Sequence, residues 1–101
     1  MEIQNAQNKV DELIKVYGGY WEPLSMLARL TEEVGELSRA MNIKFGQKKS
    51  KSSQDGKAIN EELADVMFTT LAISNQLNIN LDIEFNNKLE KDFKKCKEVY
   101  I

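Results

Sequence analysis

Two short acidic motifs in this sequence match each other position by position. EEVGEL, residues 32–37, and EELADV, residues 61–66, each carry two glutamates followed by a third acid. Residues three or four apart are neighbours on a helix surface, where like charges repel. In each motif the second and third acids would lie roughly 60° apart around a helix. These two pairs, whose repulsion needs an explanation, are Glu33 with Glu36 and Glu62 with Asp65.

A divalent cation would account for both pairs. The first acid of each pair borders the apolar stripe of its helix, so the carboxylates would lie along the seam where two helices pack. Antiparallel packing would bring all four together, and two unit charges ~4 Å apart repel by about 4 kcal/mol at an effective dielectric of ~20. A cation with oxygen ligands removes that repulsion. The predicted metal ligands are Glu33, Glu36, Glu62 and Asp65.

Two further acids, Glu32 and Glu61, stand next to these pairs and are the candidate catalytic residues. Carboxylates there could position a water molecule or bind a second ion. The competing interpretation is that both motifs are solvated faces of charged helices, since charged residues are mostly exposed. The matched register beside two apolar stripes favours the metal site.

The chain contains no histidine and a single cysteine, Cys96. This composition excludes a Ser-His-Asp triad, a Cys-His pair and zinc sites built from histidine or several cysteines. Any metal must be held by oxygen atoms, which suits Mg²⁺, Mn²⁺ or Ca²⁺; the expected ion is Mg²⁺, with Mn²⁺ as its substitute. Cys96 falls on the apolar stripe of the last predicted helix, so we expect a buried, unreactive thiol.

Basic and aromatic residues near the acidic motifs are candidates for binding a substrate. Lysines beside a Mg²⁺ site favour polyphosphate binding, although solubilising loop lysines or a solvated helix face would give the same pattern. Trp21, beside a Gly-Gly turn, could stack on a nucleobase or pack against a core or an interface. The candidate substrate contacts are Lys44, Lys48, Lys51, Lys88 and Trp21.

Helices must position these residues, because apolar residues recur at spacings of three and four along most of the chain. Gly18 and Gly19 would end the first helix, and Pro23 suits the first turn of the second. A polar loop rich in Lys, Ser and Gly occupies residues 46–57. No segment alternates like a strand, so the predicted fold class is all-α. The predicted helices cover residues 3–16, 23–45, 59–77 and 81–100.

Length and charge narrow the class of protein. At 101 residues the chain is expected to form one domain, residues 1–101, whose small core could be shared with a second subunit. A net charge of −2 and a pI near 5.2 argue against binding a nucleic acid polymer. Since no apolar run approaches the ~20 residues that cross a bilayer, and the N-terminus has no signal-peptide core, we expect a cytoplasmic protein without a membrane partner.

The paired motifs resemble those of the MazG-like, all-α nucleoside triphosphate pyrophosphohydrolases. The likeness extends through YWEPLSMLARLTEEVGELSRAMNIKFGQKKSK and INEELADVMF, it is strongest over residues 17–80, and it points to the small single-domain branch. Few families hold Mg²⁺ with carboxylates from two helices and no histidine. The final segment, KCKEVYI, departs from the family pattern, which continues into a longer tail with Arg and aromatic residues.

The resemblance implies four helices per subunit, packed into an oligomeric bundle as a homodimer or as a homotetramer (a dimer of dimers). It implies Mg²⁺-dependent hydrolysis of an NTP or dNTP to the monophosphate and pyrophosphate. It makes the four carboxylates above the metal ligands, and Glu32 the residue that orients or deprotonates the attacking water. Two alternatives stay open: a specialised substrate such as dUTP, dCTP or phosphoribosyl-ATP, and a non-catalytic helical dimerisation module whose acids bind a structural Mg²⁺ or a basic partner.

Overall fold

The computed structural model describes residues 2–46 and 58–100. Within them the chain forms α1 (Ile3–Val16), α2 (Pro23–Phe45), α3 (Ile59–Gln76) and α4 (Leu81–Tyr100), with no strand. The predicted all-α fold class and its four helices are confirmed. The described helices include none with the length and apolarity that a bilayer span requires. Two of the predicted phosphate-binding residues, Lys48 and Lys51, lie outside the described residues.

Local backbone chemistry sets where the helices begin and end. Pro23 stands in the first turn of α2, where its missing N–H needs no helical partner. After α1, Gly18 and Gly19 adopt positive φ angles of 106° and 101°, which cost glycine little. Asn78 has a φ of 57° between α3 and α4, and asparagine tolerates this left-handed region better than most residues. Pro23 thus begins α2, and Gly18 and Gly19 follow the end of α1, as the sequence predicts.

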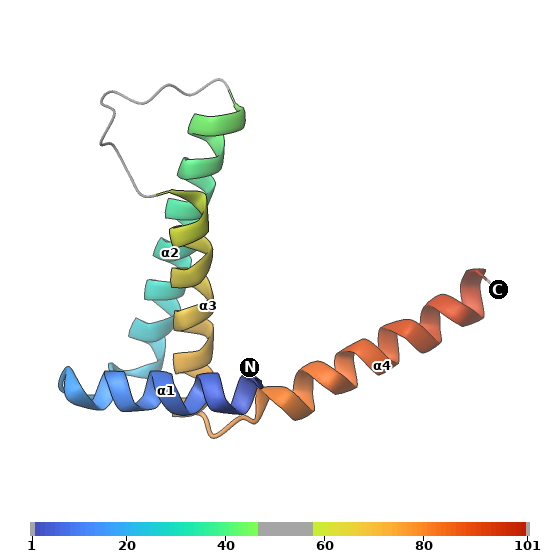
Figure 1. Ribbon diagram of the computed structural model, residues 1–101, viewed down its shortest axis with the longest axis horizontal. Helices are drawn as coiled ribbons and strands as arrows, with labels where there is room; N and C mark the ends of the chain where they lie inside the picture. Colours follow the sequence, from blue (N-terminus) through green and yellow to red (C-terminus); the bar gives the residue numbers. More distant parts are fainter. Residues whose placement is uncertain (1, 47–57, 101) are drawn as a thin grey trace.

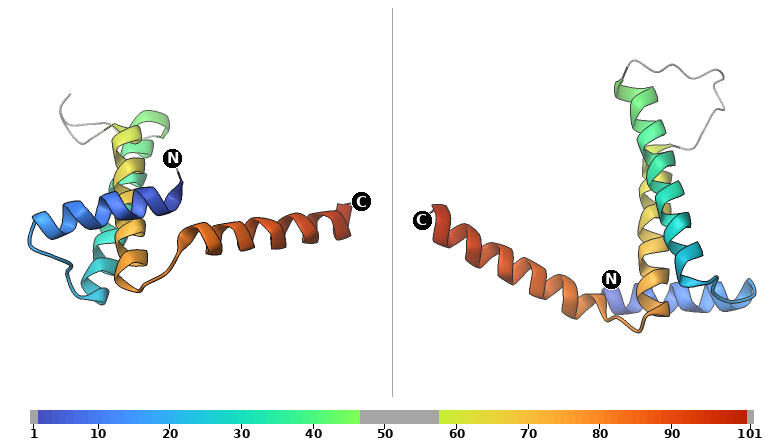
Figure 2. Two further views of the ribbon diagram at one scale, coloured as in Figure 1. Left: turned by 60° about the horizontal axis from the view of Figure 1, so that its bottom comes forward. Right: turned by 180° about the vertical axis from the view of Figure 1, so that it is seen from behind.

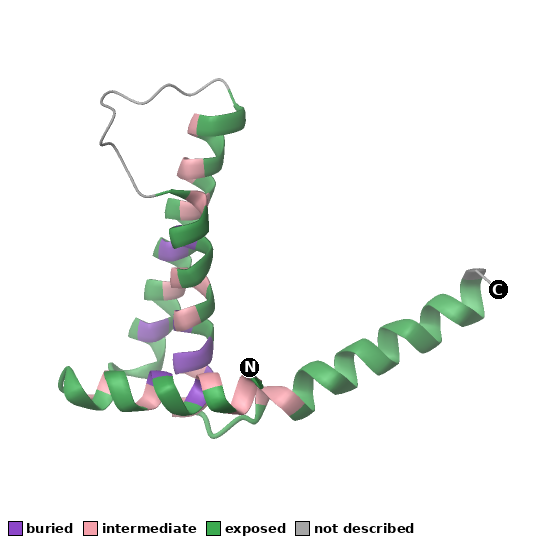
Figure 3. Ribbon diagram, in the orientation of Figure 1, coloured by how far each residue is buried: buried purple, intermediate pink, exposed green. Residues whose placement is uncertain are grey.

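α2 and α3 lie side by side as a long antiparallel pair, and α1 crosses them where α2 begins and α3 ends (Figures 1 and 2). The apolar core sits at this crossing, where Val10 of α1 and Met26 of α2 pack with Leu71 and Ala72 of α3. Further buried residues follow the seam between α2 and α3 (Figure 3). Side chains that face this seam from both helices are therefore held by packing on two sides.

The apolar stripes of the long helices are only partly buried in the single chain. On α2, Leu27, Val34 and Met41 are 53%, 48% and 46% exposed, and on α3 Leu63 is 53% exposed. Along most of its length α2 has α3 as its neighbour among the described residues. One neighbouring helix covers one side of a stripe and leaves the other side in water.

α4 packs against the start of α1 and then extends away from the other helices (Figures 1 and 2). The carboxylate of Asp82 accepts hydrogen bonds from the backbone N–H groups of Ile3, at 3.2 Å, and Gln4, at 2.8 Å. Those N–H groups belong to the first turn of α1 and have no partner within that helix. Asp82 therefore caps α1 from another helix and fixes where α4 departs.

A buried glutamine, Gln7 of α1, bonds to α3, to the turn after it and to the start of α4. Its Nε2 atom donates to Ser74 Oγ and to the Ile79 carbonyl oxygen, at 2.8 and 2.9 Å. Its Oε1 atom accepts the N–H of Leu81 at 3.1 Å. Both ends of the buried amide are thus satisfied, and the network ties α1 to the turn between α3 and α4.

Cys96 is exposed, so the prediction of a buried thiol is wrong for the single chain. The physical reason is that α4 leaves the body of the molecule after its first turn. Its apolar residues Phe85, Leu89 and Phe93 are consequently 51%, 42% and 66% exposed. The predicted packing of subunits into a bundle concerns more than one chain and stays a prediction.

Candidate metal centre

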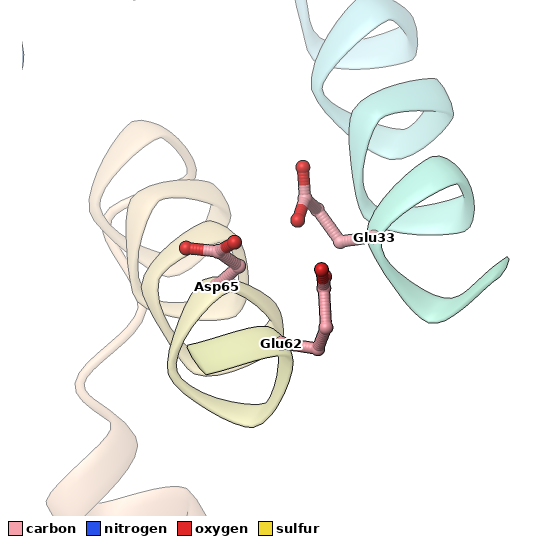
Figure 4. Close-up of side chains that lie close together, drawn as sticks. All are labelled: Glu33, Glu62 and Asp65. Carbon is pink, nitrogen blue, oxygen red and sulfur yellow. The ribbon is translucent and has the colours of Figure 1, made fainter. Parts of the chain in front are cut away.

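Three carboxylates converge on the seam between α2 and α3 (Figure 4). Glu33 comes from α2, and Glu62 and Asp65 come from α3, where a spacing of three residues puts them on one face. One carboxylate oxygen from each residue lies within 4.8 Å of those of the other two. The two acidic motifs therefore do meet across an antiparallel helix pair, through three of the four predicted metal ligands.

The three side chains are unusually sheltered for acids. Glu33 and Glu62 are only 5% and 2% exposed, and Asp65 is half-buried. Glutamate and aspartate are almost never buried without a compensating group, because removing a carboxylate from water costs several kcal/mol or more. An arrangement of this kind is costly unless positive charge is brought to it.

The other three predicted acidic residues are exposed and are close to this group in sequence. Glu36 lies one turn beyond Glu33 on α2, is exposed, and is not part of the converging group. Glu32 and Glu61, the candidate catalytic residues, are also exposed and immediately precede Glu33 and Glu62. The metal and catalytic roles of all three stay predictions.

Arg29 contacts the group directly and was not singled out from the sequence. Its Nη2 atom lies 2.8 Å from Glu33 Oε1, and its Nη1 atom lies 3.6 Å from Glu32 Oε2. The signal that could have found it is its position four residues before Glu33 on the same helix. Charge pairs at that spacing are common on helix surfaces, but this one reaches a buried carboxylate.

A cavity of about 390 Å³ opens beside the carboxylates. One part of its wall is polar and includes Arg29, Glu33 and Asp65, and another part is aromatic. A volume of this size falls within the range of small-molecule sites. The aromatic wall is formed by Tyr17, Tyr20, Trp21 and Phe68.

Two contacts hold the aromatic wall in place. The Tyr20 hydroxyl donates to Asp11 Oδ1 at 2.6 Å, and burial together with that carboxylate raises the pKa of Tyr20. The hydrogen bond from Lys15 and, to a smaller extent, the one from Tyr20 lower the pKa of Asp11. The Trp21 carbonyl oxygen accepts a hydrogen bond from Gln76 Nε2, near the end of α3. The turn that carries Tyr20 and Trp21 is thus anchored to α1 and to α3.

Of the three predicted substrate contacts that lie within the described residues, Trp21 lines this cavity and Lys44 and Lys88 do not. Lys44 stands near the end of α2, where its Nζ atom lies 5.5 Å from the centre of the Phe45 ring. Lys88 pairs with Asp92 at 2.7 Å on the extended α4. The structure of one chain does not bring these two lysines to the carboxylates, and their roles stay predictions.

The donor set at the seam fits a hard divalent cation. All its ligand atoms are carboxylate oxygens, which suit Mg²⁺ and Mn²⁺ better than softer metals. Mg²⁺ prefers six oxygen ligands and usually keeps several waters. Three protein carboxylates beside a cavity would leave positions for water and for oxygen atoms of a bound molecule.

Comparison with known proteins identifies a matching family and similar structures. Residues 21–100 match the MazG nucleotide pyrophosphohydrolase domain family. The protein YpjD of Bacillus subtilis strain 168 is 39% identical over 90 residues, covering 88% of this chain and 81% of YpjD. The crystal structure of YpjD gives a TM-score of 0.79 at 38% identity, with 90% of this chain and 94% of that chain covered. A Bacillus-conserved MazG protein, described as a nucleotide pyrophosphohydrolase, gives 0.76 at 38% identity, covering 90% and 88% of the two chains.

Proposed function

Because the chain belongs to the MazG nucleotide pyrophosphohydrolase family and is therefore a hydrolase of phosphoric anhydride bonds, we propose that its substrate is a nucleoside or deoxynucleoside triphosphate. The products are the monophosphate and pyrophosphate, and the cofactor is Mg²⁺. The observation that carries this proposal is the convergence of three carboxylates beside a cavity with an aromatic wall. A nucleotide matches both features. Its phosphate chain binds Mg²⁺, and its flat base can stack on the aromatic wall.

Glu33, Glu62 and Asp65 are the metal ligands in this proposal, with Glu36 as a fourth, outer ligand. When bound, Mg²⁺ supplies charge neutralisation for the phosphate oxygens and for the leaving pyrophosphate. The three carboxylates would hold it beside the cavity, and the burial of Glu33 and Glu62 would keep bulk water from weakening the electrostatic interaction.

Glu32 and Glu61 are the catalytic carboxylates. Each is next in sequence to a metal ligand and exposed, so each has room to accept a hydrogen bond from a water molecule. As a general base, one of them takes a proton while the water oxygen bonds to phosphorus and the pyrophosphate oxygen departs with its bonding electrons. Phosphoryl transfer depends mainly on such positioning and charge stabilisation.

The aromatic wall is the proposed binding site for the nucleobase. Trp21 is 58% exposed and lines the cavity, which leaves its indole ring available for stacking. Base-aromatic stacking contributes about 1–3 kcal/mol per base and accepts any base. dUTP, dCTP and phosphoribosyl-ATP therefore belong in the substrate panel. Lys44, Lys48, Lys51 and Lys88 are kept as candidate phosphate contacts.

The protein is proposed to work in the cytoplasm as a homodimer or homotetramer, and its exposed apolar side chains support the association. Leu24, Phe45 and Phe93, on α2 and α4, are 80%, 71% and 66% exposed. Large exposed apolar surfaces are rare on monomers and usually mark interfaces. A second copy would cover them and could bring the predicted lysines of one chain to the cavity of another.

Release of pyrophosphate from the common NTPs and dNTPs, with Mg²⁺ and with EDTA, tests the proposal. We expect Mg²⁺-dependent release by the wild-type protein and a loss of at least about 100-fold in Asp65→Asn. Asp92→Asn is the matched control, because Asp92 is an exposed aspartate on α4 paired with Lys88. Mg²⁺-independent release, or equal rates in both variants, would rule out the proposed site.

A further inference from the structure

Arg29 lies one helical turn before Glu33 on α2 and faces two environments. Its guanidinium donates to Glu33 Oε1 at 2.8 Å, and the Glu33 side chain is only 7% exposed. The Arg29 side chain is itself 48% exposed, and it lines the cavity together with Glu33 and Asp65. The same guanidinium is thus in contact with a predicted metal ligand and with the space where a ligand would lie.

Charge explains why the pair forms. Glu33 is buried near two other carboxylates, and Arg29 brings a positive charge to it. A divalent cation held by the three carboxylates would neutralise Glu33 more completely. It would also lie close to the guanidinium and repel it. Arg29 and the cation therefore compete for the negative charge of the same carboxylate.

A bound triphosphate gives the Arg29 guanidinium a new partner, because it brings several negative charges to the cavity. Arginine presents a planar fork of N–H donors that matches phosphate oxygens, and such charge-assisted hydrogen bonds are among the stronger ones in proteins. A guanidinium released from Glu33 needs only to change side-chain rotamer, because it already lines the cavity.

We infer that Arg29 is a phosphate-binding residue of this site, held by Glu33 until a divalent cation takes that carboxylate and then transferred to the nucleotide phosphates. This inference rests on the proposed function and adds a residue and an order of events to it. The Glu33–Arg29 pair keeps the buried carboxylate compensated before the substrate arrives. The exchange couples metal binding to phosphate binding.

The first test measures Mn²⁺ binding to the free protein by electron paramagnetic resonance, without nucleotide. In Arg29→Gln the competing charge is gone, so Mn²⁺ affinity should rise roughly 3- to 10-fold. Lys9→Gln is the matched control, since Lys9 is exposed on α1 and the change removes the same charge. An unchanged or lower Mn²⁺ affinity in Arg29→Gln overturns the exchange, because Arg29 would then merely orient Glu33.

The second test measures nucleotide affinity with saturating Mn²⁺. The probe is the α,β-imido analogue of whichever nucleotide the wild-type protein hydrolyses fastest. Arg29→Gln should weaken its binding about 10- to 100-fold, the range expected for losing hydrogen bonds to a charged group. Arg29→Lys, which keeps the charge and loses the fork, should fall between Arg29→Gln and wild type. Equal affinity for wild type and Arg29→Gln overturns the phosphate contact.

These outcomes separate this inference from the proposed function. If the wild-type protein binds no Mn²⁺ and hydrolyses no nucleotide, the proposed function fails. If the wild type binds Mn²⁺ and hydrolyses a nucleotide while Arg29→Gln matches it in both assays, only the role of Arg29 fails. Circular dichroism melts of each variant show that the fold is intact before either comparison is made.

Discussion

At the level of single residues, the site is a balance between buried carboxylates and the positive charge brought to them. Glu33, Glu62 and Asp65 lie close enough to share one cation, and Arg29 already compensates one of them. Glu36 belongs to the same motif but lies exposed, outside the converging group. Residues of the same type and motif thus have unequal environments, and their substitutions should have unequal effects.

The loss of Mn²⁺-dependent stabilisation on substitution should show how much each of these acids contributes to metal binding. Mn²⁺ at about 100 times its dissociation constant should stabilise the wild-type protein by about 2.7 kcal/mol against unfolding. Asp65→Asn should lose nearly all of that stabilisation, because it removes the charge of one of the three converging carboxylates, the proposed metal ligands. Glu36→Gln should lose a smaller part, because Glu36 lies outside it. Thermal melts with Mn²⁺ and with EDTA measure the difference, and an equal loss in both variants would contradict the ranking.

At the level of the helices, the polar contacts between α1, α3 and α4 decide how the elements are joined. Asp82 caps the first turn of α1, and Gln7 bonds to α3 and to the turn before α4. Such contacts join segments far apart in the sequence. They hold α1 across the end of the α2–α3 pair, and α1 in turn contributes Leu13 and Ile14 to the cavity.

Removing the cap should destabilise this junction. Asp82→Ala leaves two N–H groups of α1 without their carboxylate partner, which typically costs about 1 kcal/mol. In a domain of this size that corresponds to a fall in Tm of roughly 4–8 °C. Asp92→Ala, on an exposed part of the same helix, should change stability by only about 0.3–0.5 kcal/mol, the usual size for an exposed i,i+4 pair. Equal shifts for the two variants in thermal melts would refute the capping role.

At the level of the whole molecule, a single chain leaves much of its apolar surface in water. α4 extends from the α1–α3 body and is mostly exposed (Figure 3). Several apolar residues of α2 and α3, among them Leu24, Leu27 and Leu63, are more than half exposed. A small domain buries a limited share of its surface by itself. The shape is that of a subunit whose remaining core is supplied by a second copy.

Charging the apolar side of α4 should weaken association. The wild-type protein should behave as a dimer or tetramer in size-exclusion chromatography with light scattering. Phe93→Asp should weaken association at least about tenfold, since burying a phenylalanine contributes about 1.5–3 kcal/mol. Asn87→Asp introduces the same charge at an exposed polar position of α4 and serves as the control. A monomeric wild type, or identical masses for all three proteins, would contradict the proposed assembly.

The sequence by itself determined the helices and the chemistry available to them. Apolar residues at spacings of three and four, with Gly18 and Gly19 after the first helix and Pro23 at the start of the second, set element boundaries through local backbone preferences. The absence of histidine limited any metal site to oxygen ligands. The matched acidic motifs predicted that α2 and α3 would bring carboxylates together, because residues three apart share a helix face.

Only the tertiary structure decided which of those residues meet. Glu33 is buried in the seam and Glu36 is exposed. This difference depends on how the neighbouring helix packs and not on local spacing. The crossing of α1 over the α2–α3 pair creates the cavity that joins Trp21 to Arg29 and Asp65. The departure of α4 exposes Cys96, which its place on an apolar stripe predicted to be buried. Each depends on contacts between distant segments, which no local pattern encodes.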